Sequence, residues 1–266
     1  MSPERPGISI RWLEAKWAKL HRLPVQNRTT NNATRDFWSP LHRLIVFALA
    51  ATSIWSLLIE FFGWLSMRNF TLFVALPALV VLVALALLDL AIGTQRLWRA
   101  TLVGAIAGLV AAVAYDIFRL PFVYADSLRI QHVVPALKLF NVFPRFGAMI
   151  LSQPLEQQHY SAMTQLVGWA YHFSNGLTFG IMYVALIGDA TKRHWAWAVV
   201  FAVGLELAML FTPYPAFFHI PLTSKFVIVT LAAHLVFGVF MGRATLVLWR
   251  LLRPSATTGT GRRPLN

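Results

Sequence analysis

The sequence predicts an all-α integral membrane protein, a six-helix transmembrane bundle with both termini inside (N-in/C-in) and an amphipathic outer cap segment. Three observations support this prediction. The apolar residues come in long runs, only 12% of the residues are charged, and most of the lysines and arginines fall on one side of the predicted membrane. Soluble domains have about 25% charged residues, whereas long apolar runs are typical of spanning helices.

The apolar runs place six spans, each close to the length that crosses about 30 Å of hydrocarbon. They are expected at residues 44–65, 70–92, 100–118, 162–187, 195–212 and 223–249. The chain then divides into a cytoplasmic basic arm with an amphipathic interfacial helix (1–43), a transmembrane domain (44–252) and a disordered cytoplasmic tail (253–266).

The distribution of basic residues predicts the orientation. With the N-terminus inside, the basic residues on the outer side are Arg68, Arg119, Arg129, Lys138, Arg145 and Lys225, and the rest of the 23 lie inside. Because cytoplasmic loops carry the excess of positive charge, both termini are expected in the cytoplasm, at the cell inner membrane. Topology then accounts for most of the net charge of +13 without a nucleic-acid partner. The expected partners are the lipid bilayer and, at the basic arm, anionic inner-leaflet lipids.

The segment 119–160, between the third and fourth spans, remains rich in apolar side chains. Four prolines interrupt it: Pro121, Pro135, Pro144 and Pro154. A solvent-exposed loop of this length would not be so apolar. We therefore expect short amphipathic helices that cap the outer end of the bundle or partly re-enter it.

Two spans carry a histidine followed by glycines four and eight residues later. These His–Gly ladders are His172, Gly176 and Gly180 in YHFSNGLTFG, and His234, Gly238 and Gly242 in HLVFGVFMG. Residues at this spacing line one face of a helix, so each ladder predicts a groove with an imidazole at its outer end. Such a groove can be a helix contact through small residues or space for a flat, bulky ligand, and the sequence leaves both open.

Ionisable residues within the apolar spans are the main candidates for a site. His172, Glu206 and His234 lie near the middle of the last three spans, at similar expected depth. Ionisable groups at the centre of a bilayer are costly, and they usually face the bundle interior, where they pair or serve a function. We therefore expect Glu206 to pair with one of the two histidines.

An internal repeat is suggested by the third and fifth spans. VGAIAGLVAAVAYDIF and VGLELAMLFTPY each have an early glycine and a later carboxylate, Asp116 or Glu206, and the next span of each carries a ladder. Transporters often place their sites at the interface of such repeats. Secondary candidates are Asp116, Arg119 one turn after it, and Asn175, which is expected to face a neighbouring helix.

Four functions are compatible with these residues. The preferred one is a transporter or channel in which His172, Glu206 and His234 bind a small solute or relay protons. The second is a haem protein with the two histidines as axial ligands. The third is a membrane enzyme with the same three residues around a divalent metal, and the fourth is a structural membrane protein.

The sequence requires no cofactor and favours no enzymatic activity. The chain has no cysteine, which excludes disulfides, thiolate ligands and cysteine nucleophiles. The HExxH spacing of many zinc enzymes and a serine-nucleophile motif are also missing from the sequence. An oligomer is compatible with the sequence, which does not define one.

The stretch HLVFGVFMG resembles the last helix of several small, uncharacterised families of bacterial polytopic membrane proteins. The stretch YHFSNGLTFG extends this resemblance to a second helix. The resemblance implies a bacterial inner-membrane protein with a glycine-laddered final helix, and it implies no particular chemistry.

Overall fold

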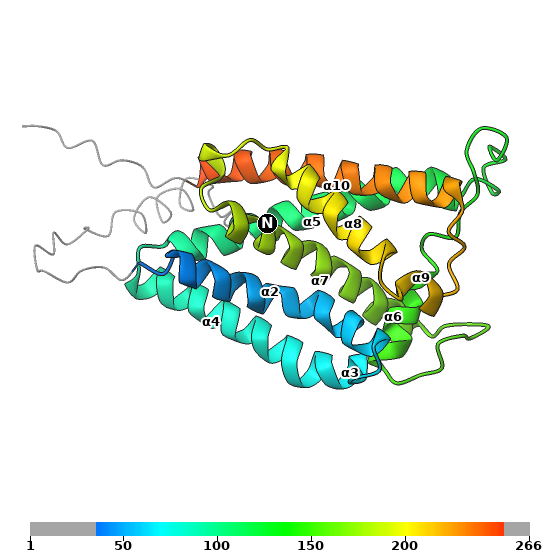
Figure 1. Cartoon of the computed structure of the whole chain (residues 1–266), viewed down its shortest axis with the longest axis horizontal. Coiled ribbons are helices and arrows are strands. Elements are labelled where there is room, and N and C mark those ends of the chain that lie inside the picture. Colours follow the sequence, from blue (N-terminus) through cyan, green and yellow to red (C-terminus); the bar gives the residue numbers. More distant parts are fainter. Residues whose placement is uncertain (1–35, 253–266) are drawn as a thin grey trace, which may run out of the picture. The chain divides into compact units, whose positions relative to one another are not determined.

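The computed structural model describes residues 36–252 (Figure 1). Within this range the chain forms helices and no strand, which confirms the all-α prediction. The predicted tail at 253–266 and the predicted arm, up to residue 35, lie outside the described residues.

Six long helices make up most of the described chain. They are α2 (Pro40–Phe61), α4 (Leu76–Ile92), α5 (Arg96–Val123), α7 (Ala162–Ile187), α8 (Trp197–Leu210) and α10 (Ser224–Leu251). Two short elements run directly into α4: α3 (Met67–Phe70) and η1 (Thr71–Ala75). The other short elements are α6 (Val142–Ile150), η2 (Ala190–Lys192) and α9 (Tyr214–Phe217).

Four helices are long and apolar enough to cross a membrane: α2, the continuous helix Met67–Ile92, α5 and α10. This agrees with the predicted membrane class. The 26-residue α7 is not in this set, and the apolar α8 has only 14 residues. Because α7 packs against α2, α5 and α6, it has less need of an apolar surface than a helix that faces lipid on most sides.

Polar caps determine where several helices begin. Ser39, Ser66, Ser161 and Thr223 each precede a helix, and each side-chain oxygen accepts a hydrogen bond from the backbone N–H three residues later. Such a cap satisfies one of the donors that the first helical turn leaves free. The first two helices therefore begin a few residues before the apolar runs that predicted them.

The contact between α5 and α7 is the most extensive in the bundle. α7 also packs against α2 and α6, α5 packs against α4 and α10, and α8 packs against α10. The helices α4, α2, α7 and α5 thus form a closed group in which each contacts the next, and α10 joins α5 to α8 (Figure 1).

Glycines bring the backbones of α5 and α7 into direct contact. A Cβ atom added to Gly180 would lie 2.0 Å from the backbone oxygen of Gly104. One added to Gly108 would lie 2.1 Å from the backbone oxygen of Gly176. The glycines of the first ladder therefore form a helix-packing seam of the small-xxx-small type.

The second ladder packs against α8 in the same way. A Cβ atom on Gly238 would lie 2.5 Å from the Cα of Val199, and one on Gly242 would lie 2.3 Å from the backbone oxygen of Trp195. The backbone of a neighbouring segment thus fills the groove of each ladder. Of the two uses that the sequence left open, the structure shows the helix contact, and the grooves have no space for a flat ligand.

The segment 119–160 is more helical than predicted at its start. α5 continues to Val123, beyond the predicted end at residue 118, and α6 lies at the same end of the bundle as α3 and α9 (Figure 1). α6 contacts α7 through Gly147 and Gly168, where an added Cβ would lie 1.9 Å from a backbone oxygen of the other helix. The segment is therefore packed against the bundle through α6.

Replacing Gly180 with Ala should destabilise the protein, because the new methyl group would overlap the backbone of α5. We expect a loss of about 2 kcal/mol, the usual cost of overpacking, measured by unfolding in detergent. Gly204→Ala is the matched control, since a Cβ atom there meets nothing within 4 Å. The control should be neutral or slightly stabilising. Equal effects at both positions would contradict the seam.

Candidate functional site

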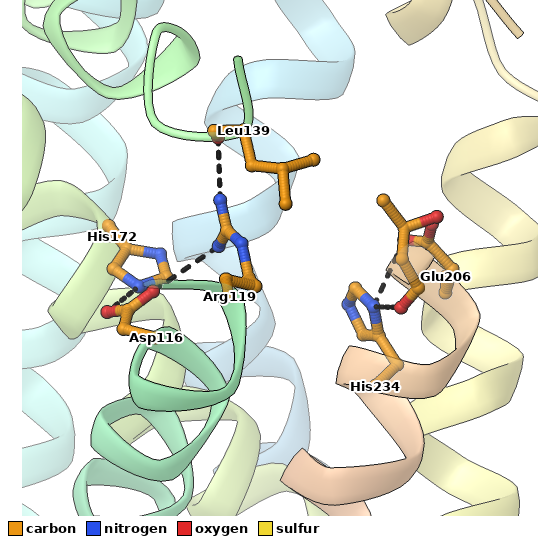
Figure 2. A network of polar contacts seen from close by, with 7 residues as sticks. Asp116, Arg119, Leu139, His172, Glu206 and His234 are labelled. Atoms are coloured by element: carbon orange, nitrogen blue, oxygen red, sulfur yellow. Dashed lines mark hydrogen bonds and ion pairs between the residues drawn. The ribbon is translucent and has the colours of Figure 1, made fainter. Parts of the chain in front are cut away.

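Two His–carboxylate pairs form the candidate site (Figure 2). His172 Nε2 lies 2.9 Å from Asp116 Oδ2, which joins α7 to α5. His234 Nδ1 lies 3.3 Å from Glu206 Oε2, which joins α10 to α8. Between 5% and 14% of each of these four side chains is exposed. The structure therefore divides the predicted cluster, because His172 pairs with Asp116 and only His234 pairs with Glu206.

Helix register explains why each histidine meets a carboxylate. On α5 and α8 a carboxylate follows two small residues at intervals of four, so all three share one face. The residues are Gly108, Ala112 and Asp116 on α5, and Ala198, Ala202 and Glu206 on α8. The partner helices α7 and α10 run in the opposite direction and present His, Gly and Gly at the same interval. Packing of the small residues thus brings the two polar ends together, once in each helix pair.

Arg119 completes the first pair. Its Nη1 lies 3.3 Å from Asp116 Oδ1, and its Nη2 donates a hydrogen bond of 2.6 Å to the carbonyl of Leu139 (Figure 2). The guanidinium also lies over the rings of Phe140 and Phe143, at 4.8 and 5.2 Å from their centroids. Arg119 therefore compensates the charge of Asp116 and connects the segment after α5 to the site.

The second pair has a different charge balance. His234 Nδ1 lies 3.0 Å from the carbonyl oxygen of Thr230. Because a carbonyl oxygen only accepts hydrogen bonds, Nδ1 carries a proton, and in the neutral ring Nε2 is the acceptor. Among the described residues, no lysine or arginine makes an ion pair with Glu206. Among the described residues, His234 is therefore the only ion-pair partner of this carboxylate.

Tyr115 lies between the two pairs. Its ring centroid is 6.1 Å from that of His172 and 5.0 Å from that of His234. The guanidinium carbon of Arg119 is 4.5 Å from the same ring. An aromatic residue near the end of a span is typical of an interfacial belt, so the sequence alone does not distinguish Tyr115 from an ordinary interfacial residue.

A cavity of about 390 Å³ adjoins both pairs. Its polar lining includes Tyr115, Arg119, His172, Asn175, Glu206 and His234, and most of the remaining lining is apolar or aromatic. A largely apolar cavity with a few convergent polar groups is typical of a small-molecule site. The Nε of Arg119 is buried without a hydrogen-bond partner among the described residues, which leaves a donor in the cavity wall.

Asn175 joins the cavity wall to α2. Its Oδ1 accepts a hydrogen bond of 2.6 Å from the hydroxyl of Ser53, and the backbone oxygen of Ser53 accepts one of 3.0 Å from Tyr171. Asn175 thus faces a neighbouring helix, as the sequence predicted. The hydrogen bond from Ser53 to its amide oxygen holds α7 against α2.

α9 and the residue after it close the cavity beside α6. Tyr214 and Phe218 line the cavity and contact each other at 5.1 Å between ring centroids. Arg145 Nη1 donates a hydrogen bond of 2.7 Å to the carbonyl of Phe218 and so fixes this segment. Burial raises the pKa of Tyr214, so its hydroxyl stays protonated at neutral pH.

The predicted metal ligands do not converge on a metal centre. Within residues 36–252, no group of three or more His, Cys, Asp or Glu side chains could hold a metal ion. Each histidine of the site contacts a carboxylate, and helix backbone fills both glycine grooves. The geometry therefore gives no support to metal or haem ligation by His172 and His234.

Comparisons with known proteins do not assign this chain to a family. No family model, no curated protein and no solved structure matches it. Function is therefore inferred from the geometry and charges of the site itself.

Replacing Arg119 with Gln should destabilise the fold, because the buried carboxylate of Asp116 loses its charged partner. Breaking a buried pair on one side typically costs about 3–5 kcal/mol. Adding Asp116→Asn should recover part of this loss, since both charges are then absent. Unfolding in detergent of the two single variants and the double variant measures the coupling. Strictly additive losses would show that the two groups do not stabilise each other.

Proposed function

We propose that this chain is an inner-membrane protein with six spans that allows a small solute or protons to permeate through the cavity. The observation that carries the proposal is the presence of two buried His–carboxylate pairs beside one cavity inside an apolar helix bundle. Ionisable groups at such depth are costly, and in membrane proteins they commonly mark solute pathways or proton relays.

The six-span count rests on α7 and α8 in addition to the four long apolar helices. α7 has 26 residues, enough to span, and its polar side chains contact α2 and α5. α8 has only 14 residues, and the turn and α9 that follow it extend the segment that would make up the fifth span. Six spans with the basic ends inside satisfy the positive-inside rule, which supports both termini in the cytoplasm.

The two pairs have different roles in this proposal. Asp116 has Arg119 as a permanently charged partner, so the pair with His172 acts as a positioning group. Among the described residues, Glu206 has only His234 within ion-pair distance. Glu206 and His234 therefore exchange the proton or contact the solute.

The arrangement of the helices also suggests how access to the cavity changes. Each His–carboxylate pair lies within one helix pair, α5 with α7 or α8 with α10, whereas the cavity takes its lining from both. One helix pair can then move against the other without breaking either polar contact. Movement of one repeat against another is a common transport mechanism.

Reporter fusions test the proposed topology. Fusions at the N-terminus and the C-terminus should both report the cytoplasm, and a fusion near residue 130 should report the outer side, because six spans return the chain to its starting side. Termini on opposite sides of the membrane would exclude six spans. A cytoplasmic position for residue 130 would exclude the proposed orientation.

Flux through reconstituted vesicles tests the proposed function. Vesicles with the wild-type chain should acidify faster than empty vesicles after an imposed pH gradient, or shrink and swell faster with small solutes. Glu206→Gln should lower this flux by about tenfold or more, as expected when a proton-transfer group is lost. Asp116→Asn/Arg119→Gln, which removes the other charge pair, tests the asymmetry of the two pairs and should lose less flux than Glu206→Gln. Lys225→Gln, which removes an exposed charge that does not line the cavity, is the control and should retain the wild-type flux.

The outcomes separate this proposal from a structural role. If neither protons nor small solutes cross faster than through empty vesicles, the chain is not a permeation path. If Glu206→Gln and Asp116→Asn/Arg119→Gln lose flux equally while both remain folded, the two pairs share one role and the asymmetry is wrong.

A further inference from the structure

A second cavity, of about 480 Å³, lies among the starts of α2 and α5 and the ends of α7 and α10. It is lined by Trp38, Arg43, Arg96, Arg99, Gly188, Asp189, Lys192 and Trp249. We propose that this cavity binds a phosphate group, either on the headgroup of an anionic phospholipid or on a soluble phosphate-bearing ligand. Nothing in the permeation proposal requires this site.

The charge of the lining favours an anion. Four of the eight lining residues are lysine or arginine, and Asp189 is the only acid among them. The carboxylate of Asp189 accepts hydrogen bonds from the backbone N–H and the hydroxyl of Thr191, at 2.9 and 2.8 Å. Even with Asp189 counted, the lining has three more basic than acidic residues, so the cavity keeps an excess of positive charge.

Two arginines are held in place at the cavity wall. Arg43 Nε donates a hydrogen bond of 2.8 Å to the carbonyl of Ala185, and the same guanidinium donates to Leu186. Arg99 Nη2 donates one of 2.7 Å to the carbonyl of Trp249, and its guanidinium lies 4.6 Å from the centroid of that ring. Fixed guanidinium groups lose little freedom on binding, which suits them to phosphate oxygens.

Two further cations are free to close on a ligand. Lys192 is exposed, and 63% of the Arg96 side chain is exposed, with a single ion pair of 3.4 Å to Asp36. Exposed ion pairs of this kind contribute little, so Arg96 can exchange Asp36 for a phosphate at small cost. The site thus combines two anchored arginines with two mobile cations.

The position of the cavity indicates a phospholipid as the natural source. The helix ends around it are the ones that the proposed topology places at the cytoplasmic surface, where anionic headgroups lie. Trp38 and Trp249 line the cavity, and tryptophan is enriched in the interfacial region of membrane proteins. The phosphate chemistry follows from the lining alone, and only the lipid source depends on the orientation.

Native mass spectrometry of the full chain tests the proposal. The protein is reconstituted in a phosphatidylcholine bilayer with a minor fraction of phosphatidylglycerol, released, and its retained lipids are counted. Wild-type protein should retain phosphatidylglycerol in preference. Arg96→Gln/Lys192→Gln should lower this preference by about tenfold, as expected from the loss of two cations near a phosphate.

The matched control is Arg193→Gln/Arg250→Gln, which removes two exposed charges that do not line the cavity. It should retain the wild-type preference. A second measurement compares thermal unfolding in sodium phosphate and in sodium chloride of equal ionic strength. If phosphate stabilises wild type more than the cavity variant without any lipid preference, the ligand is a soluble phosphate. Equal behaviour of the cavity variant and the control, or no response to either probe, would overturn the proposal.

Discussion

The direct backbone contact between α5 and α7 is the constraint on which the rest of the bundle depends. Because Gly104, Gly108 and Gly180 have no side chains, the two helix backbones touch, and this contact fixes the register of α5 against α7. In that register, Asp116 and His172 lie further along the shared face and pair at 2.9 Å. A bulkier seam would separate the helices and leave two ionisable groups unpaired in an apolar interior, a much larger cost than the loss of packing alone.

The end of the bundle that carries α6 depends on this pair in turn. Arg119 reaches the carboxylate of Asp116 from the same helix and holds the carbonyl of Leu139, so the chain after α5 is drawn over the site. α6 then packs against α7 through Gly147 and Gly168, again by backbone contact. The segments that wall the cavity are thus held by contacts with α5 and α7, the two helices that the glycine seam joins.

The sequence predicted where the helices lie along the chain, but not which helices contact one another. Long apolar runs located all six long helices to within a few residues, because burial in lipid or protein demands an apolar surface whichever neighbour provides it. The spacing of His, Gly and Gly defines a helix face. A packing seam and a ligand groove require the same spacing, so the pattern alone does not distinguish them. The third span was expected to end at residue 118, but α5 continues to Val123, and Arg119 pairs with Asp116 within the bundle.

The two helix pairs follow one sequence pattern but differ in a single charge. Each has small residues and a carboxylate on one helix against a histidine and two glycines on the other, so packing gives both the same geometry. An arginine accompanies only the first carboxylate, at Arg119, whereas Glu206 has His234 alone. In an apolar interior, Arg119 gives the first carboxylate a permanent cationic partner, whereas the second has only a histidine beside it. Under the proposed function, this single added cation makes one copy of the unit structural and leaves the other to take part in permeation.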